Sequence, residues 1–524
     1  MPSPTFAPVP RANPRPLVVL ALLLACLCGL ARFHDLDRMV VWHDEVFSVA
    51  RVLGYDHAQT HDAVYGTGRI LRPDDLLRVQ RPDPDHGWGD TWHALRGHPE
   101  HGPLYYLIGR LGTELAEPAI VGLRGTSAAL SLLLLPAMAW LARELFGRGA
   151  APWFAIALVA VAPIHLLYAQ EARQYALWSA LIAASSAALL RALRRERGGD
   201  WALYGGLLAI GLYTHLLMAL VAAVHAGYGL WRSHGDRSAL RRFIVRFAAA
   251  AGGASLLFLP WLVVVLGHWD EMRNYTGWMA TPARPAQLAT AWANHLARPF
   301  VDLPELPLAW LAVIPLLAMA VRYRDRQSDR RLLWLLALVP LALVAIPDLL
   351  VGGRRSLESR YLMPTFLALE LLCAGALGHA WAAGGTKRRL AIAGLVLAVS
   401  AGLLSQLRIL TADSWWTKSY SARNAAFAEL VNSKAHPLIL ASDGAVNTGE
   451  LVSLSYRLQP HVRLLPRSDD TPPSLPPGYS DLFALLPGDK LRAWLQADYV
   501  IQPFPGTWQW FSLVRREPSD RAAP

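Results

Sequence analysis

An apolar stretch near the start of the chain decides the fold class, since residues 17–31 read LVVLALLLACLCGLA without a single charge. Shortly after it stands the tetrapeptide Trp42-His43-Asp44-Glu45. A charged side chain inside a bilayer costs roughly 3 kcal/mol or more unless it faces water, a partner or a substrate. Two adjacent carboxylates just outside a membrane span are therefore candidates for function, and a solvated polar loop is the simpler alternative.

The composition indicates an integral membrane protein. The 524 residues are 54% hydrophobic and only 17% charged, against about 25% charged in soluble domains. Runs of roughly 17 to 25 apolar residues can cross a bilayer. We expect a polytopic α-helical membrane protein with eleven spans, near residues 17–33, 120–142, 151–169, 174–193, 201–214, 216–231, 243–267, 305–321, 332–351, 361–382 and 389–406.

Positive charges set the expected orientation. With a cytoplasmic N-terminus, every predicted inside segment is basic, from Arg11 and Arg15 to the run Lys387-Arg388-Arg389, as the positive-inside rule requires. An odd number of spans then places the C-terminal segment outside. The net charge of +11 is explained by these loops, and we expect no nucleic acid partner.

Two domains are predicted. Residues 1–405 form the transmembrane domain, with a long first outer loop at 34–119, and residues 406–524 form a small extracytoplasmic α/β domain. In the loop, the apolar pattern predicts a surface helix over 62–81 and a second helix that starts at Pro103. In the tail, we expect strands at 437–441, 462–465 and 499–501, and a loop at 472–477. The three cysteines all fall in spans, so no disulfide is expected.

Polar residues gather at the span ends that face outside. On the predicted topology they lie on one side of the membrane with Asp44 and Glu45, and individually several could be structural ion pairs, helix caps or snorkelling side chains. As candidates for binding the substrate and the donor phosphate we select His101, Tyr105, Arg124, Gln170, Glu171, Arg173, Tyr175, His215, Arg354, Arg355, Arg360 and Tyr361.

Carboxylates combined with several guanidinium groups suit one kind of reaction. Transfer of a sugar from a polyprenyl phosphate expels a phosphate that is already a stable anion, so its departure needs cations more than a general acid. Arginine supplies these cations as a planar fork. The acceptor needs a general base. We assign this role to Asp44, with Glu45 orienting it or helping to hold the acceptor.

Four motifs resemble the C-type multi-spanning glycosyltransferases, close to the bacterial relatives of protein O-mannosyltransferases and of lipid A aminoarabinose transferase. They are the Asp-Glu pair at Asp44, the His-x-Pro-Leu-Tyr-Tyr run at His101, the Tyr-Ala-Gln-Glu-Ala-Arg-x-Tyr run at Tyr168 and the Arg-Tyr-Leu-x-Pro run at Arg360. The resemblance covers residues 17–405 and leaves the tail unmatched. Family members often have two prolines where this chain has Gly102-Pro103.

The resemblance implies inverting transfer from a polyprenyl-phosphate sugar to an extracytoplasmic acceptor, in the plasma membrane, with Asp44 as catalytic carboxylate. No cofactor is firmly implied. A single Asp-Glu pair favours a metal-independent enzyme, and a divalent metal at Asp44 and Glu45 stays open. Two alternatives also stay open, namely a transporter or flippase for a lipid-linked or anionic solute, and an envelope glycan polymerase or ligase.

Overall fold

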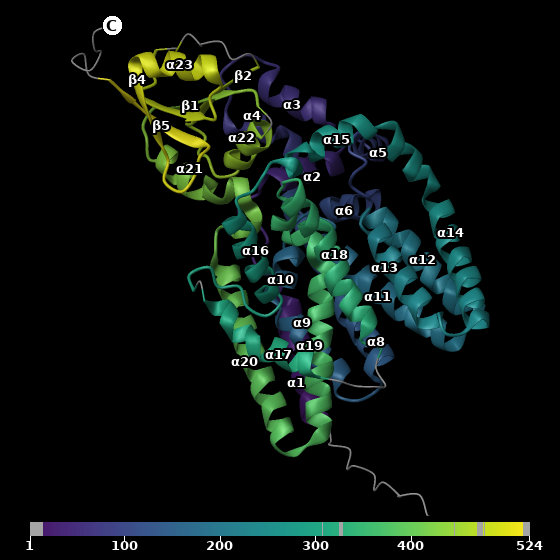
Figure 1. Cartoon of the computed structure of the whole chain (residues 1–524). Coiled ribbons are helices and arrows are strands. Elements are labelled where there is room, and N and C mark those ends of the chain that lie inside the picture. The colour runs from purple at the N-terminus through teal and green to yellow at the C-terminus, as the bar shows by residue number, and fades with distance from the viewer. Residues whose placement is uncertain are drawn as a thin grey trace, which may run out of the picture.

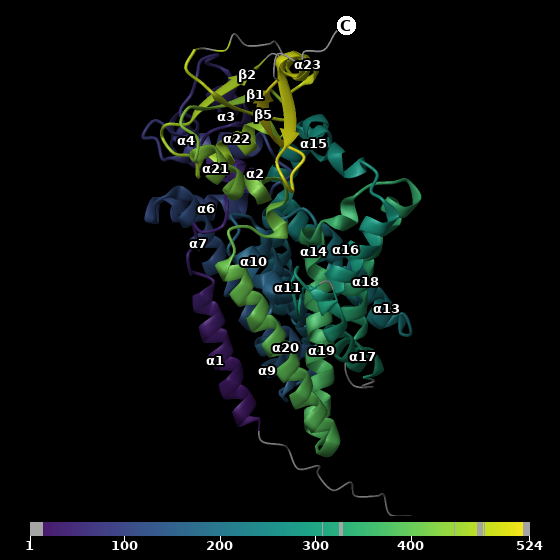
Figure 2. The same ribbon diagram turned by 90° about the vertical axis from the view of Figure 1, so that its left-hand side faces the viewer.

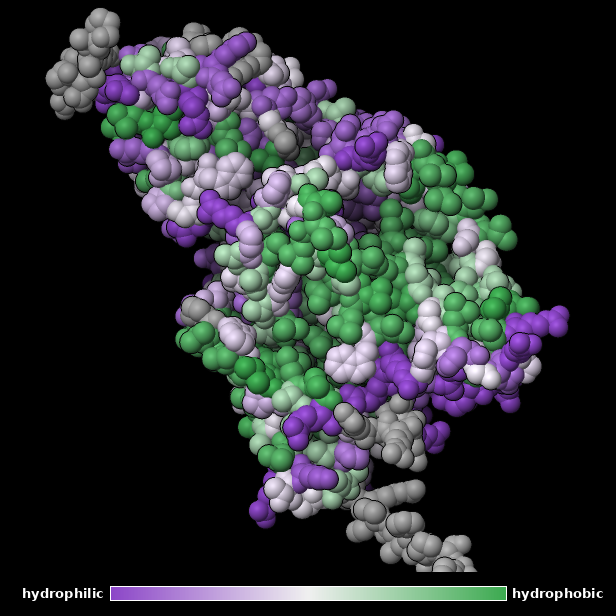
Figure 3. All heavy atoms as spheres, in the orientation of Figure 1, coloured by the Kyte–Doolittle hydropathy of each residue, from purple (hydrophilic) through white to green (hydrophobic). Residues whose placement is uncertain are grey.

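The computed structural model describes residues 14–306, 308–323, 329–444, 446–468, 475 and 477–516. The predicted loop at 472–477 lies mostly outside these residues. A long bundle of helices carries a mixed α/β cap at one end (Figures 1 and 2). The chain surface is apolar over the middle of the bundle and polar at both ends (Figure 3), as expected of a protein that spans a membrane.

Each predicted span overlaps with helical structure. The helices are α1 (Arg15–Ala31), α7 (Ala119–Ser131) followed by α8 (Leu134–Phe146), α9 (Ala151–Val161) with α10 (Pro163–Ala169), α11 (Tyr175–Arg195), α12 (Gly198–Thr214), α13 (Met218–Ser233), α14 (Arg237–Gly267), η3 (Ala309–Val313) with α17 (Ile314–Arg322), α18 (Arg331–Leu350), α19 (Met363–Ala383) and α20 (Gly385–Thr411).

Length separates these helices into two groups. Within the described residues, six are long and apolar enough to cross a membrane, or seven if the bent pair α9 and α10 counts as one span. Helices of 16 or 17 residues such as α1, α12 and α13 extend over only about 25 Å at about 1.5 Å per residue. The chain is a multi-pass integral membrane protein, and the count of eleven spans stays a prediction.

The first outer loop folds into short helices, namely α2 (His43–Leu53), α3 (His57–Tyr65), α4 (Pro73–Leu77), η1 (Arg78–Gln80), α5 (Trp88–Arg96) and α6 (Pro103–Leu115). The predicted continuous helix over 62–81 is wrong. Gly68 adopts a positive φ of 60°, and Leu71 forms a bridge to Leu464 in the tail instead. The helix predicted to start at Pro103 is confirmed.

Two further outer segments lie beside this loop. The first contains α15 (Trp269–Thr276), η2 (Gly277–Ala280) and α16 (Pro285–Ala297). The second, before α19, contains η4 (Arg355–Leu357) and η5 (Ser359–Leu362). Both lie where the bundle meets the cap (Figure 1).

The tail forms the cap around a five-stranded sheet in the order β2-β1-β3-β5-β4. Its elements are η6 (Trp416–Arg423), α21 (Asn424–Asn432), β1 (Pro437–Ser442), α22 (Asn447–Ser455), β2 (Arg463–Arg467), β3 (Asp481–Leu485), α23 (Asp489–Asp498), β4 (Tyr499–Pro503) and β5 (Trp510–Arg515). The three predicted strands correspond to β1, β2 and β4, whereas β3 and β5 were missed. A mixed α/β domain is confirmed.

The cap and the first outer loop share one hydrophobic core. Val46 and Val49 of α2 belong to the same buried cluster as Phe427, Leu451 and Trp510 of the tail. Because this apolar surface is buried jointly, the tail holds α2 against the bundle. The loop that carries Asp44 and Glu45 is therefore fixed by two distant parts of the sequence.

Candidate active site

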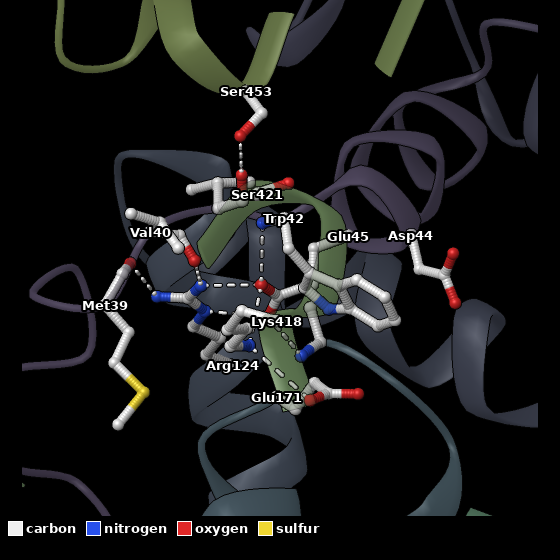
Figure 4. A network of polar contacts seen from close by, with 12 residues as sticks. Met39, Val40, Trp42, Asp44, Glu45, Arg124, Glu171, Lys418, Ser421 and Ser453 are labelled. Carbon is white, nitrogen blue, oxygen red and sulfur yellow. Dashed lines mark hydrogen bonds and ion pairs between the residues drawn. The ribbon is translucent and has the colours of Figure 1, made fainter. Parts of the chain in front are cut away.

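Helix α2 presents the two carboxylates in different directions. Asp44 and Glu45 stand in its first turn, where the helix dipole favours negative charge. The carboxylate of Glu45 also accepts the backbone N–H of Trp42 at 3.4 Å, which caps the helix. Adjacent residues on a helix lie about 100° apart, and Figure 4 shows Asp44 pointing away from the network around Glu45.

Glu45 is the centre of a buried ionic network (Figure 4). Its side chain is fully buried and accepts hydrogen bonds from Arg124 Nε at 2.9 Å and Nη2 at 2.6 Å. The backbone N–H of Ala172 donates at 2.8 Å and Lys418 Nζ at 2.9 Å. Burial raises the pKa of Glu45, but Arg124 and Lys418 outweigh it and hold the pKa below its usual range. Glu45 is an ionised anchor that has no free oxygen for an acceptor.

Arg124 also uses its hydrogen-bond donors within the protein. Besides binding Glu45, its Nη1 donates to the carbonyls of Leu36 at 2.7 Å and Met39 at 3.0 Å, and its Nη2 to Val40 at 2.9 Å. The guanidinium is 1% exposed. These bonds fix the turn between α1 and α2, and they leave Arg124 without a donor for the phosphate that the sequence suggested.

Lys418 of η6 joins the network from the tail. Its ammonium group lies 2.9 Å from Glu45 Oε2 and 3.5 Å from Glu171 Oε2, and its side chain is 2% exposed. Burial raises the pKa of Glu171, as does the negative charge of Glu45, although Lys418 lowers it. Lys418 therefore limits the rise in the pKa of Glu171, and this buried carboxyl group lies inside the network instead of facing a substrate.

Asp44 faces the opposite way, toward two arginines. Its Oδ2 accepts a hydrogen bond from Arg360 Nη1 at 3.0 Å and lies 3.4 Å from Arg173 Nη2, and the side chain is 24% exposed. Desolvation raises the pKa of Asp44, but the positive charges of Arg173 and Arg360 lower it by more. The pKa of Asp44 is therefore below its usual range. Asp44 is thus an ionised, accessible carboxylate.

Both arginines retain a free donor. Among the described residues, neither Arg173 Nε nor Arg360 Nε has a hydrogen-bond partner, although both atoms are buried. The rings of Trp42, Trp278 and Tyr361 lie within 5.9 Å of the Arg360 guanidinium carbon. Trp278 therefore packs at the site. An oxyanion placed beside Asp44 would find two guanidinium groups.

Arg354 and Arg355, the two other predicted phosphate ligands before α19, differ in whether they keep a free donor. Arg355 donates to Asp348 at 3.0 Å, an ion pair that ties down the outer end of α18. Arg354 Nε is buried and has no partner within the described chain. Of these two predicted phosphate ligands, Arg354 keeps a donor available and Arg355 has its Nη1 committed to Asp348.

Three other predicted residues are held by contacts within the protein. Tyr105 is fully buried and its hydroxyl contacts Ser127 at 2.7 Å. Gln170 donates to the carbonyl of His34 at 2.8 Å. Tyr175 packs 5.9 Å from the Arg173 guanidinium carbon. Their contacts position the loops and the arginine.

His101 and His215 meet through their backbones in an isolated antiparallel bridge, and the ring of His215 stacks on Trp178 at 4.4 Å. Burial lowers the pKa of His215 to about 3, so the ring is neutral. The bridge also explains Gly102, because a Cβ there would lie 2.4 Å from the carbonyl oxygen of Tyr213.

The carboxylates do not fit a divalent metal. Both oxygens of Glu45 already bind cationic groups, and Asp44 Oδ2 faces two guanidinium groups. No cluster of three or more His, Cys, Asp or Glu side chains suited to a metal occurs in the described part of the chain. The metal left open at Asp44 and Glu45 is not supported by the donor set.

Two important residues were missed from the sequence. Lys418 lies in the tail, for which no motif was recognised. Arg51 stands seven residues after Asp44, a helical spacing that places both on one face of α2, and its Nη1 is buried with no partner among the described residues. The spacing could have identified Arg51, but nothing local marks Lys418.

Comparisons with known proteins give one family match and several similar folds. Residues 98–264 match the family described as dolichyl-phosphate-mannose-protein mannosyltransferase. No curated protein sequence matches the chain.

The fold is similar to crystal structures of ArnT from Cupriavidus metallidurans. The structure bound to undecaprenyl phosphate has a TM-score of 0.54 and 14% identity over 98% of this chain and 100% of that chain. The apo structure has a TM-score of 0.55 and 14% identity over 96% and 98%. The family match, over residues 98–264, agrees with the resemblance seen in the motifs, and the fold similarity to ArnT agrees with a membrane glycosyltransferase of the C type.

Proposed function

We propose that the protein transfers a sugar from a polyprenyl-phosphate donor to an extracytoplasmic acceptor, with inversion at the anomeric carbon and Asp44 as general base. The observation that carries this proposal is the partly exposed Asp44 carboxylate with Arg360 and Arg173 at one of its oxygens. A single displacement requires a base for the acceptor and cations for the departing phosphate on opposite sides of one sugar, and Asp44 and the two arginines supply these two kinds of group.

The two arginines are suited to the leaving group. A polyprenyl phosphate carries negative charge that grows as the bond to the sugar breaks, and preorganised cations stabilise this charge in a water-poor site. Arg173 and Arg360 hold buried, unpartnered Nε–H groups within the described chain. The related ArnT structure contains undecaprenyl phosphate, which is a donor carrier of this class.

Donor binding also adjusts the base. In the structure, Arg173 and Arg360 hold the pKa of Asp44 low after desolvation has raised it, and a carboxylate with a low pKa is a weak base. A phosphate placed between these arginines neutralises part of their charge, which raises the pKa of Asp44 again. Asp44 thereby becomes a stronger base only when the donor is in place.

The position of the charges distinguishes this proposal from transport. Transporters hold their substrate near the bilayer midplane with broken helices in repeated halves. Here Asp44 stands in the first turn of α2, a helix that lies where the bundle meets the cap (Figure 1), and Arg173 and Arg360 contact its carboxylate. A polymerase or ligase would account for the cations but gives no role to Asp44.

A donor assay tests the proposal. The full-length protein, purified in detergent, is incubated with a panel of undecaprenyl-phosphate hexoses and pentoses and with envelope membranes as acceptor source, and the release of undecaprenyl phosphate is followed. Asp44→Asn should lower turnover by about 10²- to 10⁴-fold, as expected for a lost general base. Asp37→Asn, at an exposed position of the same loop, should be unaffected. A turnover above about a tenth of wild type in Asp44→Asn would overturn the assignment.

A further inference from the structure

One face of α2 remains accessible beside the catalytic carboxylate. Among the residues of α2, only His43, Asp44 and Phe47 keep partial exposure, and the others are buried. Asp44, Phe47 and Arg51 follow each other at intervals of three and four residues, so they share one face. Over seven residues this face extends about 10 Å along the helix from the base.

Aromatic rings form a continuous wall along this face. The ring of Phe47 stacks on His57 with centroids 5.5 Å apart and an interplanar angle of 9°. His57 lies 5.5 Å from His98, and His98 lies 4.5 Å from Tyr275 of α15. The guanidinium carbon of Arg51 lies 5.8 Å from the Phe47 ring. The first outer loop and the segment that contains α15 therefore contribute to one wall.

Three buried polar atoms at this wall lack a partner. Within the described residues, no hydrogen bond reaches Arg51 Nη1, His98 Nε2 or Glu100 Oε2. Arg51 is 7% exposed and His98 is 4% exposed. A buried polar group left unpaired costs about 1–3 kcal/mol. Three such groups near one base indicate a site that a ligand completes.

The protonation states give these atoms distinct roles. Burial lowers the pKa of His98 to about 4, so its ring is neutral. The distance of 3.3 Å from His98 Nδ1 to Glu100 Oε1 indicates that Nδ1 carries the proton and donates it, which leaves Nε2 as an acceptor. Arg51 offers a donor, and Glu100 offers a second acceptor. The charges of Arg51 and Glu100 balance.

We propose that this face of α2 binds the acceptor, and that the acceptor is a hydroxylated sugar residue of an envelope glycan. Each sugar hydroxyl offers one donor and two acceptor lone pairs, so two neighbouring hydroxyls of a sugar can donate to His98 and Glu100 and accept from Arg51. A phosphate acceptor would bring only acceptors to Glu100 and be repelled by it. The rings of Phe47 and Tyr275 suit the C–H faces of a sugar. The inference rests on the proposed function.

The transfer step uses Asp44 as the proton acceptor and the polyprenyl phosphate as the leaving group. The acceptor hydroxyl gives its proton to Asp44 while its oxygen forms a bond to the anomeric carbon of the donor sugar. The bond from that carbon to the phosphate oxygen breaks, and the electron pair leaves with the polyprenyl phosphate. Arg51, His98 and Glu100 hold neighbouring hydroxyls of the acceptor and do not exchange protons.

The linkage formed by the wild-type enzyme gives the first test. With a radiolabelled donor and envelope membranes, we expect label that resists both protease and mild acid, as a glycosidic bond between sugars does. Label in a protease-sensitive fraction, or label released by mild acid as from an anomeric phosphate, would overturn the inference. Absence of any donor turnover would instead contradict the proposed function itself.

The variants give the second test. In Arg51→Met and, independently, Glu100→Gln, transfer to the glycan should fall at least about tenfold relative to acceptor-independent hydrolysis of the donor, as expected when a hydrogen bond to a charged group is lost. Arg96→Met, at an exposed position of α5, is the matched control and should leave the ratio unchanged. If transfer and hydrolysis fall in parallel in both variants, these residues support the fold and do not bind the acceptor.

Discussion

Replacing Lys418 by methionine should destabilise the active site through an electrostatic effect that pH can reverse. Methionine keeps the length of the side chain but removes the charge that lies between Glu45 and Glu171. Arg124 then remains as the ionic partner of Glu45, whereas Glu171 keeps no direct ionic partner among the described residues. Removing one member of a buried ion pair costs about 3–5 kcal/mol, which is the loss of unfolding free energy that we expect at pH 8.

The pH dependence follows from Glu171. Burial and Glu45 already raise its pKa in the folded protein, and loss of Lys418 raises it further. A carboxyl group with a raised folded pKa binds a proton more tightly in the folded state, so stability is greatest at low pH and falls as the pH rises through that pKa. For each pH unit below the folded pKa of Glu171, the variant regains up to about 1.4 kcal/mol of unfolding free energy. Lowering the pH from 8 to 6 should therefore restore up to about 2.7 kcal/mol.

Thermal unfolding in detergent, followed by tryptophan fluorescence at pH 6 and pH 8, measures this effect. Lys418→Met should unfold well below the wild type at pH 8 and much closer to it at pH 6. Adding Glu171→Gln, which removes the uncompensated charge, should restore most of the loss at pH 8. Lys434→Met, at a partly exposed position of the same tail, is the matched control. An unfolding temperature equal to wild type at pH 8, or a loss that neither acid nor Glu171→Gln reduces, would refute the reasoning.

Three further predictions concern the phosphate site, the first loop and the orientation. Arg360→Lys should still lower turnover at least about tenfold, because one ammonium cannot replace a planar fork; unchanged kinetics on a lipid-phosphate donor would place the phosphate elsewhere. Gly102→Ala should lower the unfolding temperature, since its Cβ meets backbone at 2.4 Å; a wild-type melting curve would contradict this. In a Cys26→Ser background, a cysteine at Gly89 should react with an impermeant thiol reagent in intact spheroplasts, whereas a cysteine at Gly149 should react only after lysis. Both glycines have open space around them, so a side chain fits at either position. The reverse labelling pattern would place the active site in the cytoplasm.

The long-range features of the site were only partly predictable. The motifs identified Asp44, Arg173 and Arg360 and suggested that they converge, and the structure brings them to one carboxylate oxygen. We also expected Glu45, from its motif, and Arg124, from its place at a span end, to act toward the substrate, whereas each pairs with the other and with backbone groups. Sequence shows that a charge must be paired, but it does not show with which partner.

From the sequence we could predict that the chain crosses a membrane, where its long apolar helices lie, and that carboxylates and arginines gather at one end. These features follow from local composition, since apolar length and helical period are properties of neighbouring residues. The folded chain alone shows that the tail supplies Lys418, and that Asp44 rather than Glu45 faces the open side. A buried charge is neutralised by whichever groups the fold brings within a few ångströms, and Lys418 reaches Glu45 and Glu171 because the cap and the first outer loop share one core.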